Sequence, residues 1–371
     1  MPKTYRKWLF AKPMTNDALG LEQFELRELP IPDLKQGHAL VRVKLINIHS
    51  GTRARMAGGM TKLGDTDYSN YACAEVIQSR DHAFREGDVI ACQAGWQDHQ
   101  VISSDDESVG YGPPSALVKA LNGTNSQWTY VFRPAMVKMW PTNVLMEMFG
   151  TSGMTAYFGM RECGPLMPRD CVVVAGTTGS VGSIAAQLAK IAGCSVVGFG
   201  GGAERCQWVL DNLGIDACID YRAPDFAKQL VAALPDGVDV YSDGIGGELT
   251  ETVAGLMNQN GRLFAYGRAA AFYADKLDMP PQRASLRQSF GISEAVERIL
   301  KKRNIKSEAW IVSEFYHERL TAEDDLTRLL RSGALKPISN VVEGFDNLPG
   351  AIVSLYQTPR AGKLQVRFEP P

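Results

Sequence analysis

The sequence lacks the features of a membrane, secreted or nucleic-acid-binding protein. Its 371 residues contain 39 Lys and Arg against 41 Asp and Glu, a net charge of −2 that gives no support to a nucleic-acid or acidic-membrane partner. No apolar run approaches the roughly 18 residues that would span a bilayer, and the first residues lead into no signal-peptide core. The expected location is therefore the cytoplasm.

Patterns for disulfides, metals and nucleophilic catalysis are also missing. The seven cysteines are an odd number without a Cys-x-x-Cys pair, so free thiols are expected. The five histidines form no close cluster with Cys or Glu, so no metal site is predicted. No Gly-x-Ser-x-Gly elbow follows a strand, which argues against a serine hydrolase. His49, His99 and His317 are accordingly predicted to be structural.

The length and composition are typical of a globular protein of two domains, and the pattern of predicted strands and helices changes near residue 143. Before it, short alternating strands are predicted at 39–46, 87–92 and 99–102, which favours an antiparallel or barrel-like β domain. Within this part, residues from about 104 to 130 form a polar, irregular insert. A loop of that length is usually functional or disordered.

After residue 143, strands alternate with helices. Buried strands are predicted at 171–175, 194–199, 238–242 and 262–266, with helical stretches between them. Such alternation predicts a parallel, doubly wound sheet.

A glycine-rich turn joins the first of these strands to an amphipathic helix. Gly176, Gly179 and Gly182 have the spacing GxxGxxG, a variant of the dinucleotide fingerprint. Glycines let the backbone approach a pyrophosphate, and the helix directs its free N–H groups at the phosphates. The alternative interpretation is a tight turn without a ligand.

The residues after the second strand indicate which nucleotide binds. Glu204 lies past the position at which an NAD enzyme places its ribose-binding acid. Arg205, by contrast, is able to bind a 2′-phosphate through charge-assisted hydrogen bonds. Tyr221 could stack or hydrogen-bond nearby. NADP is therefore favoured over NAD, and a solvated Glu204–Arg205 surface pair is the alternative.

Four segments of the chain carry a resemblance to a known family: Ala175–Ser183, Gly201–Trp208, Cys218–Arg222 and Gly150–Tyr157. Together they resemble the zinc-independent medium-chain reductases, most closely the prostaglandin/leukotriene reductases and the alkenal double-bond reductases. The resemblance covers about residues 8 to 369 and includes Val342–Pro349 and Gly362-Lys363 near the C-terminus.

The resemblance implies an α/β fold of two domains. A GroES-like β-barrel catalytic domain would comprise residues 1–143 and 333–371, and a Rossmann nucleotide-binding domain residues 144–332. It also implies NADPH-dependent reduction of the carbon–carbon double bond of an α,β-unsaturated ketone or aldehyde, in a homodimer. The alternatives left open are an NADPH-dependent quinone or carbonyl reductase and a non-catalytic nucleotide-binding member.

Where the motifs match, the resemblance also implies roles for individual residues of this chain. Tyr273 is expected to be the catalytic donor to the enolate, although Phe272 aligns with the family's tyrosine. The family's Asp-Pro-Tyr-Met-Arg stretch appears here as His49–Arg53, without its phenol, and Gly244 stands where the family has Asn. The expected cofactor-binding residues are Thr155, Gly176, Thr177, Thr178, Gly179, Ser180, Val181, Gly182, Gly201, Arg205, Tyr221, Tyr266, Gly267, Ala309, Trp310, Ile311 and Arg360.

The insert generates a hypothesis about the substrate. Together with the aromatic residues Trp128, Tyr130, Phe132 and Trp140, it could wall a pocket that admits a bulky apolar enone. A core or dimer-contact role for these aromatics is the alternative.

Overall fold

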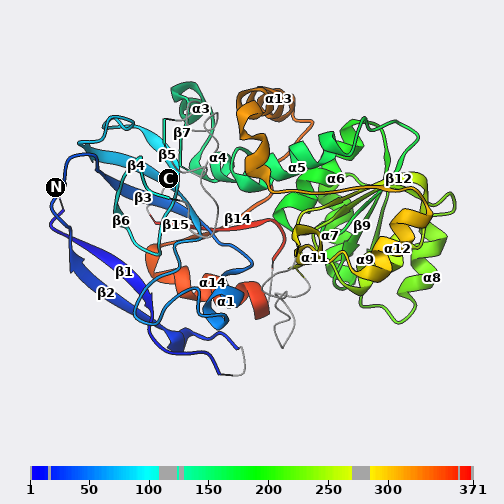
Figure 1. Ribbon diagram of the computed structural model, residues 1–371, viewed down its shortest axis with the longest axis horizontal. Coiled ribbons are helices and arrows are strands. Elements are labelled where there is room, and N and C mark those ends of the chain that lie inside the picture. Colours follow the sequence, from blue (N-terminus) through cyan, green and yellow to red (C-terminus); the bar gives the residue numbers. More distant parts are fainter. Residues whose placement is uncertain are drawn as a thin grey trace. The chain divides into compact units, whose positions relative to one another are not determined.

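The computed structural model describes residues 2–15, 18–107, 123–124, 129–269, 285–357 and 360–368, and the chain forms two compact units (Figure 1). Unit 1 comprises Met1–Gly150 and Ser339–Pro371, and unit 2 comprises Thr151–Ile338. Tyr273, Trp128 and most of the insert lie outside the described residues.

Unit 1 is rich in β structure. Its main sheet has the strand order β14-β15-β3-β4-β5-β7, with β6 also paired to β3, and β1 and β2 form a separate antiparallel pair. All neighbours in the main sheet are antiparallel except β14 and β15. The strands are β1 (Thr4–Phe10), β2 (Phe24–Pro30), β3 (Ala39–Asn47), β4 (Tyr71–Ser79), β5 (Val89–Gln93), β6 (His99–Ile102), β7 (Tyr130–Val131), β14 (Ser339–Glu343) and β15 (Lys363–Arg367).

The helices of unit 1 cover the core of this sheet. Trp96 and Phe345 are almost fully buried in it with the apolar side chains of β3, and α14 contributes Ile352. The helical segments are η1 (Leu21–Gln23), α1 (Thr52–Ala57), α3 (Pro134–Met139), α4 (Thr142–Met148), η3 (Phe345–Asn347) and α14 (Leu348–Gln357).

Helix α4 belongs to unit 1 because its polar groups bond to the sheet. Asn47 at the end of β3 donates its side-chain amide to the carbonyl oxygen of Met146, at 3.0 Å. Glu147, fully buried, accepts a hydrogen bond from the hydroxyl of Ser339 in β14. The helix thus joins the first segment of unit 1 to its C-terminal segment.

Unit 2 is built on a six-stranded parallel sheet with helices on both sides (Figure 1). The strand order β10-β9-β8-β11-β12-β13 is that of a doubly wound dinucleotide-binding fold, so the α/β fold class predicted from the sequence is confirmed. The strands are β8 (Cys171–Val174), β9 (Ser195–Gly200), β10 (Ala217–Asp220), β11 (Val238–Asp243), β12 (Met257–Ala265) and β13 (Lys306–Ala309).

Two helices of unit 2 show how closely its layers pack. Helix α5 lies against the sheet at Gly159, where an added Cβ would stand 1.8 Å from the ring of Phe264 on β12. Helix α6 buries one face, which includes Ile184 and Ala185. The helical segments are α5 (Thr151–Glu162), α6 (Ser180–Ile191), α7 (Ala203–Leu213), α8 (Phe226–Ala233), α9 (Glu248–Ala254), α11 (Leu286–Ser289), α12 (Glu294–Lys302), η2 (Val312–Glu318) and α13 (Arg319–Arg331).

The structure shows the state of the cysteines and the lengths of the helices, two features that the sequence analysis considered. All seven cysteines are free, and burial raises the pKa of the thiols of Cys73 and Cys92 to about 12. Over the described ranges, the chain forms no helix that is both long and apolar enough to cross a bilayer.

The contact at Gly159 predicts a site-specific loss of stability. Gly159→Ala should destabilise unit 2 by about 1–3 kcal/mol, because the added methyl group has to displace the buried Phe264 ring. Gly350→Ala in α14 is the matched control: its Cβ meets nothing within 4 Å, so it should raise stability by roughly 0.5–1 kcal/mol through helix propensity. Urea unfolding followed by circular dichroism measures both, and an unchanged midpoint for Gly159→Ala would contradict the packing argument.

Candidate nucleotide-binding site

The glycine-rich turn predicted from the sequence lies where the strand order of unit 2 reverses. Strands β8 and β11 are neighbours at the centre of the sheet, and their following connections lead to opposite sides. The turn after β8 meets the turn after β11 directly, because a Cβ on Gly176 would stand 3.2 Å from Cδ1 of Ile245. Ligands of doubly wound sheets bind at such a switch point.

Backbone geometry explains two of the three glycines. Gly176 has φ +69°, in the left-handed region that L-residues avoid. Its carbonyl oxygen accepts a hydrogen bond from the N–H of Gly179 at 2.8 Å. A Cβ on Gly182 would lie only 2.3 Å from that same oxygen. Glycine at position 182 therefore lets the first turn of α6 approach the end of β8.

Thr177 uses its side chain to hold the turn. Its buried hydroxyl donates to the carbonyl oxygen of Val174 at 2.7 Å and accepts from the N–H of Phe199 at 2.9 Å. It thereby ties the end of β8 to β9. A contact of Thr177 with a phosphate would therefore have to come from its backbone.

The start of α6 offers donors to a ligand. Ser183 N–H already bonds to Gly179, but the N–H groups of Ser180, Val181 and Gly182 belong to the first turn and have no acceptor within an α-helix. The hydroxyl oxygen of Ser180 is buried and has no hydrogen-bond partner in the described part of the chain. A buried hydroxyl without a partner is costly. These groups fit a pyrophosphate, whose charge would also interact favourably with the helix N-terminus.

The ends of β9 and β10 bring a second group of predicted residues together. Asp220 accepts from the N–H groups of Gly202 and Arg222, both at 2.9 Å, and these bonds lower the pKa of its carboxyl. A Cβ on Gly201 would lie 2.8 Å from the hydroxyl of Tyr221 and 3.2 Å from Nε of Arg222. Arg222 was not predicted as a site residue, although its place beside Tyr221 in the sequence was a usable signal.

Arg205 stands on α7, in the first turn after Gly202, and its side chain is half-buried. The guanidinium of Arg222 lies 5.6 Å from the centre of the Tyr221 ring. The first turn of α7 and the loop after β10 thus carry an aromatic ring and two arginines, the groups that recognise a phosphate and a base.

Tyr266 holds the turn from the other side. Its hydroxyl donates to the carbonyl oxygen of Ala175 at 3.3 Å, and burial raises the pKa of this phenol, so it stays protonated. A Cβ on Gly244 would stand 2.4 Å from the Tyr266 ring, which explains why glycine replaces the family's Asn at this position. Gly267 approaches the same segment, because its Cβ would lie 3.2 Å from the carbonyl oxygen of Gly244.

The predicted residues 309–311 lie at the end of β13, and some of their groups already have contacts within the fold. Trp310 is 7% exposed and stacks on Phe264, with ring centres 4.9 Å apart. The N–H of Ile311 donates to the carboxylate of Glu314 at 3.1 Å, and Ala309 ends β13 opposite Ala265 of β12.

The other three predicted residues belong to different parts of the chain. Thr155 is half-buried on α5, which packs against α6. Arg360 is exposed and belongs to unit 1, and Tyr273 lies outside the described residues.

Comparison with known proteins places this arrangement in a family. A family model described as the N-terminal domain of oxidoreductase matches residues 6–109, and one described as zinc-binding dehydrogenase matches residues 180–302. The two matches together span more than half of the chain. The chain belongs to the medium-chain dehydrogenase/reductase family. The resemblance inferred from the sequence motifs is thereby confirmed.

Relatives within this family match along nearly the whole chain. The NADPH-dependent curcumin reductase of Escherichia coli is 28% identical over 98% of this chain and 96% of that protein. Prostaglandin reductase 1 of Bos taurus is 27% identical over 98% of both chains. The crystal structure of CurA from Vibrio vulnificus in complex with NADPH has a TM-score of 0.77 and 26% identity, over 99% of this chain and 100% of that one.

The name of one family model mentions zinc. In the segments that the structure describes, no group of three or more His, Cys, Asp or Glu side chains is arranged to hold a metal ion.

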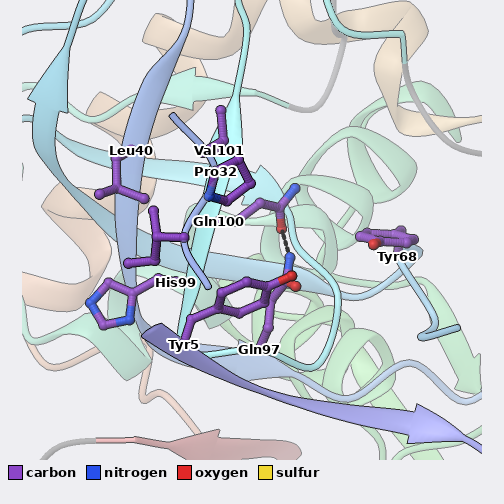
Figure 2. A pocket seen from close by; sticks show the side chains of 9 residues that line it. Tyr5, Pro32, Leu40, Tyr68, Gln97, His99, Gln100 and Val101 are labelled. Carbon is purple, nitrogen blue, oxygen red and sulfur yellow. Dashed lines mark hydrogen bonds between the residues drawn. The ribbon is translucent and has the colours of Figure 1, made fainter. Parts of the chain in front are cut away.

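Unit 1 of this medium-chain reductase has a cavity of about 200 Å³ whose lining includes Tyr5, Tyr68, Gln97 and residues 99–101 (Figure 2). Three of its polar side chains, Gln97, Gln100 and His99, have hydrogen-bond partners. Gln97 donates to Gln100 at 2.9 Å, and Nδ1 of His99 lies 3.0 Å from a carboxylate oxygen of Asp98. No residue predicted for the site lines this cavity.

The unpaired hydroxyl at the start of α6 predicts opposite effects on binding and on stability. Ser180→Ala should weaken NADPH binding roughly tenfold and slightly raise the free energy of unfolding of the nucleotide-free protein, because it removes a buried hydroxyl that no described group bonds.

Ser183→Ala is the matched control. The Ser183 hydroxyl already donates to the carbonyl oxygen of Ser180 at 3.1 Å, so its removal should leave NADPH affinity within about twofold of wild type. Isothermal titration calorimetry measures both variants, and equal affinities for them would remove Ser180 from the phosphate site.

Proposed function

We propose that the protein reduces the carbon–carbon double bond of α,β-unsaturated ketones or aldehydes, with NADPH as the hydride donor. The observation that carries the proposal is the glycine turn at the switch point of unit 2, with its unpaired Ser180 hydroxyl and free helix N-terminus. The names of the curcumin reductase and prostaglandin reductase relatives support the reaction class, and the NADPH complex of CurA supports the coenzyme.

The reaction divides the work between coenzyme and protein. NADPH supplies a hydride to the carbon β to the carbonyl group. The protein has to hold the coenzyme and stabilise the negative charge that develops on the carbonyl oxygen, because the enolate forms before the α-carbon receives a proton. No metal is needed if a neutral or cationic hydrogen-bond donor reaches that oxygen.

Selection of NADPH is assigned to the loops after β9 and β10. Arg205 and Arg222 are the cations near the end of β9, and Tyr221 lies beside Gly201. Asp220 is the last residue of β10, and two backbone N–H groups donate to one of its carboxylate oxygens, so it supports the loops at this edge. A 2′-phosphate would find two guanidinium groups there.

A substrate panel tests the function directly. The purified protein should oxidise NADPH in the presence of a conjugated enone, and the product should retain its carbonyl group while the double bond gains two hydrogens. Mass spectrometry and proton NMR of the product decide this. An alcohol product or turnover of quinones alone would instead establish a carbonyl or quinone reductase, and NADPH binding without turnover a non-catalytic member.

Loss of an arginine should change the choice of coenzyme. Arg205→Ala and Arg222→Ala should each raise the dissociation constant for NADPH by about 10- to 100-fold and leave that for NADH almost unchanged, because only NADPH carries the 2′-phosphate. The control is Arg298→Ala, an exposed arginine on α12. If both coenzymes weaken equally, the arginines do not read this phosphate.

Two finer statements remain predictions. A homodimer is expected from the resemblance, and light scattering of the purified protein measures it. A preference for bulky apolar enones is expected from the insert and from Tyr130 and Phe132. Both of these rings are buried in unit 1 and meet edge-on at 5.7 Å, which also suits a core role.

A further inference from the structure

Two basic side chains of unit 1 lie next to each other at the ends of paired strands. His49 follows β3, and Lys363 is the first residue of β15. The N–H of Ile48 donates to the carbonyl oxygen of Leu364 at 3.0 Å, which extends the pairing of these strands. The ammonium of Lys363 in turn donates to the carbonyl oxygen of Ile48 at 3.0 Å. The lysine is therefore anchored on the residue that precedes His49.

A backbone hydrogen bond decides which ring nitrogen of His49 carries the proton. The N–H of Gly51 points at Nδ1 of His49, at 3.0 Å. A backbone N–H only donates, so Nδ1 has to accept, and the proton of the neutral ring is on Nε2. The side chain is half-buried, and no group in the described segments bonds Nε2. The ring thus presents a free N–H donor.

The surrounding charges keep this donor neutral. Burial, together with the charges of Lys363 and Arg55 and against the opposing effect of Asp67, lowers the pKa of His49 to about 4. Asp67 itself bonds to Arg55 at 3.2 Å. Burial also lowers the pKa of Lys363 to about 8, with Glu147 as the opposing charge. At neutral pH, an uncharged imidazole therefore stands beside an ammonium group.

Such a pair is suited to an oxygen that becomes negative during a reaction. The Glu147 carboxylate accepts a hydrogen bond from Ser339, and in the described segments no carboxylate lies within ion-pair distance of Lys363. A fixed neutral donor and a cation that is not paired with an anion stabilise developing charge more than they stabilise a neutral carbonyl group.

We propose that Nε2–H of His49 donates a hydrogen bond to the carbonyl oxygen of the bound enone and stabilises the enolate, with Lys363 as the neighbouring positive charge. This inference rests on the proposed function, and it replaces the structural role expected for His49 from the sequence. The imidazole keeps its proton throughout. Hydride adds to the β-carbon, the double-bond electrons move to the oxygen, and the α-carbon then takes a proton from water as the carbonyl group re-forms.

Two substitutions of His49 separate its two hydrogen bonds. In His49→Asn, the amide oxygen is able to accept the Gly51 N–H in place of Nδ1, but the Nε2 donor is lost. In His49→Gln, the side-chain amide reaches the position of Nε2 as a donor, while the bond to Gly51 is lost. His82→Asn is the matched control, because the His82 side chain is 79% exposed.

His49→Asn should lower kcat about 100-fold, with a much smaller change in KM and an unchanged dissociation constant for NADPH. His49→Gln should retain kcat within about fivefold of wild type, although it melts at a lower temperature. The primary isotope effect with NADPH deuterated at the transferred position should rise in His49→Asn, because hydride transfer becomes slower than the other steps. A merely structural role would reduce the active fraction without raising the isotope effect.

If the wild-type protein reduces enones and the His49→Asn variant does so with the same kcat, the inference is wrong and the proposed function stands. A wild-type protein that reduces no enone would defeat the function itself. The tautomer has an independent test: nitrogen NMR of protein labelled at its five histidines, with His49 assigned through His49→Asn. A neutral ring protonated on Nε2 at pH 7 is expected, and an Nδ1–H tautomer or an imidazolium would contradict the geometry.

Discussion

The close approach of α6 to the end of β8 is the constraint on which the nucleotide site depends. An added Cβ at Gly182 would stand 2.3 Å from the carbonyl oxygen of Gly176, so any side chain there would push the helix away from the turn. With glycine, the first N–H groups of α6 face the place where a pyrophosphate would bind. Glycine at position 182 therefore determines how close to the sheet the phosphates would bind.

The turn itself is held by groups that never need to touch the ligand. Thr177 joins β8 to β9 through its hydroxyl, and Tyr266 bonds Ala175 from β12. Gly244 leaves room for the Tyr266 ring. Because these bonds are internal and buried, the turn is preorganised before the coenzyme arrives, and little conformational entropy remains to be lost on binding.

Two donors assigned to ligands lack a partner among the described residues. They are the Ser180 hydroxyl in unit 2 and Nε2 of His49 in unit 1, whereas the hydroxyls of Ser183 and Thr177 have partners within the fold. Desolvated polar groups without partners raise the free energy of the folded state, and a ligand that bonds them removes that penalty.

The sequence alone determined the alternation of strands and helices in unit 2, the glycine turn and the coenzyme class, because hydrophobic periodicity and glycine spacing are local properties. It also predicted β6 at its observed bounds, His99–Ile102. Only the tertiary structure showed that the Thr177 side chain faces inward, that Arg222 joins the loop after β9, and that Gly51 and Lys363 fix the state of His49. Those facts depend on contacts between residues up to 315 positions apart, such as Lys363 and Ile48, and no local pattern records which distant groups will share a hydrogen bond or a low-dielectric environment.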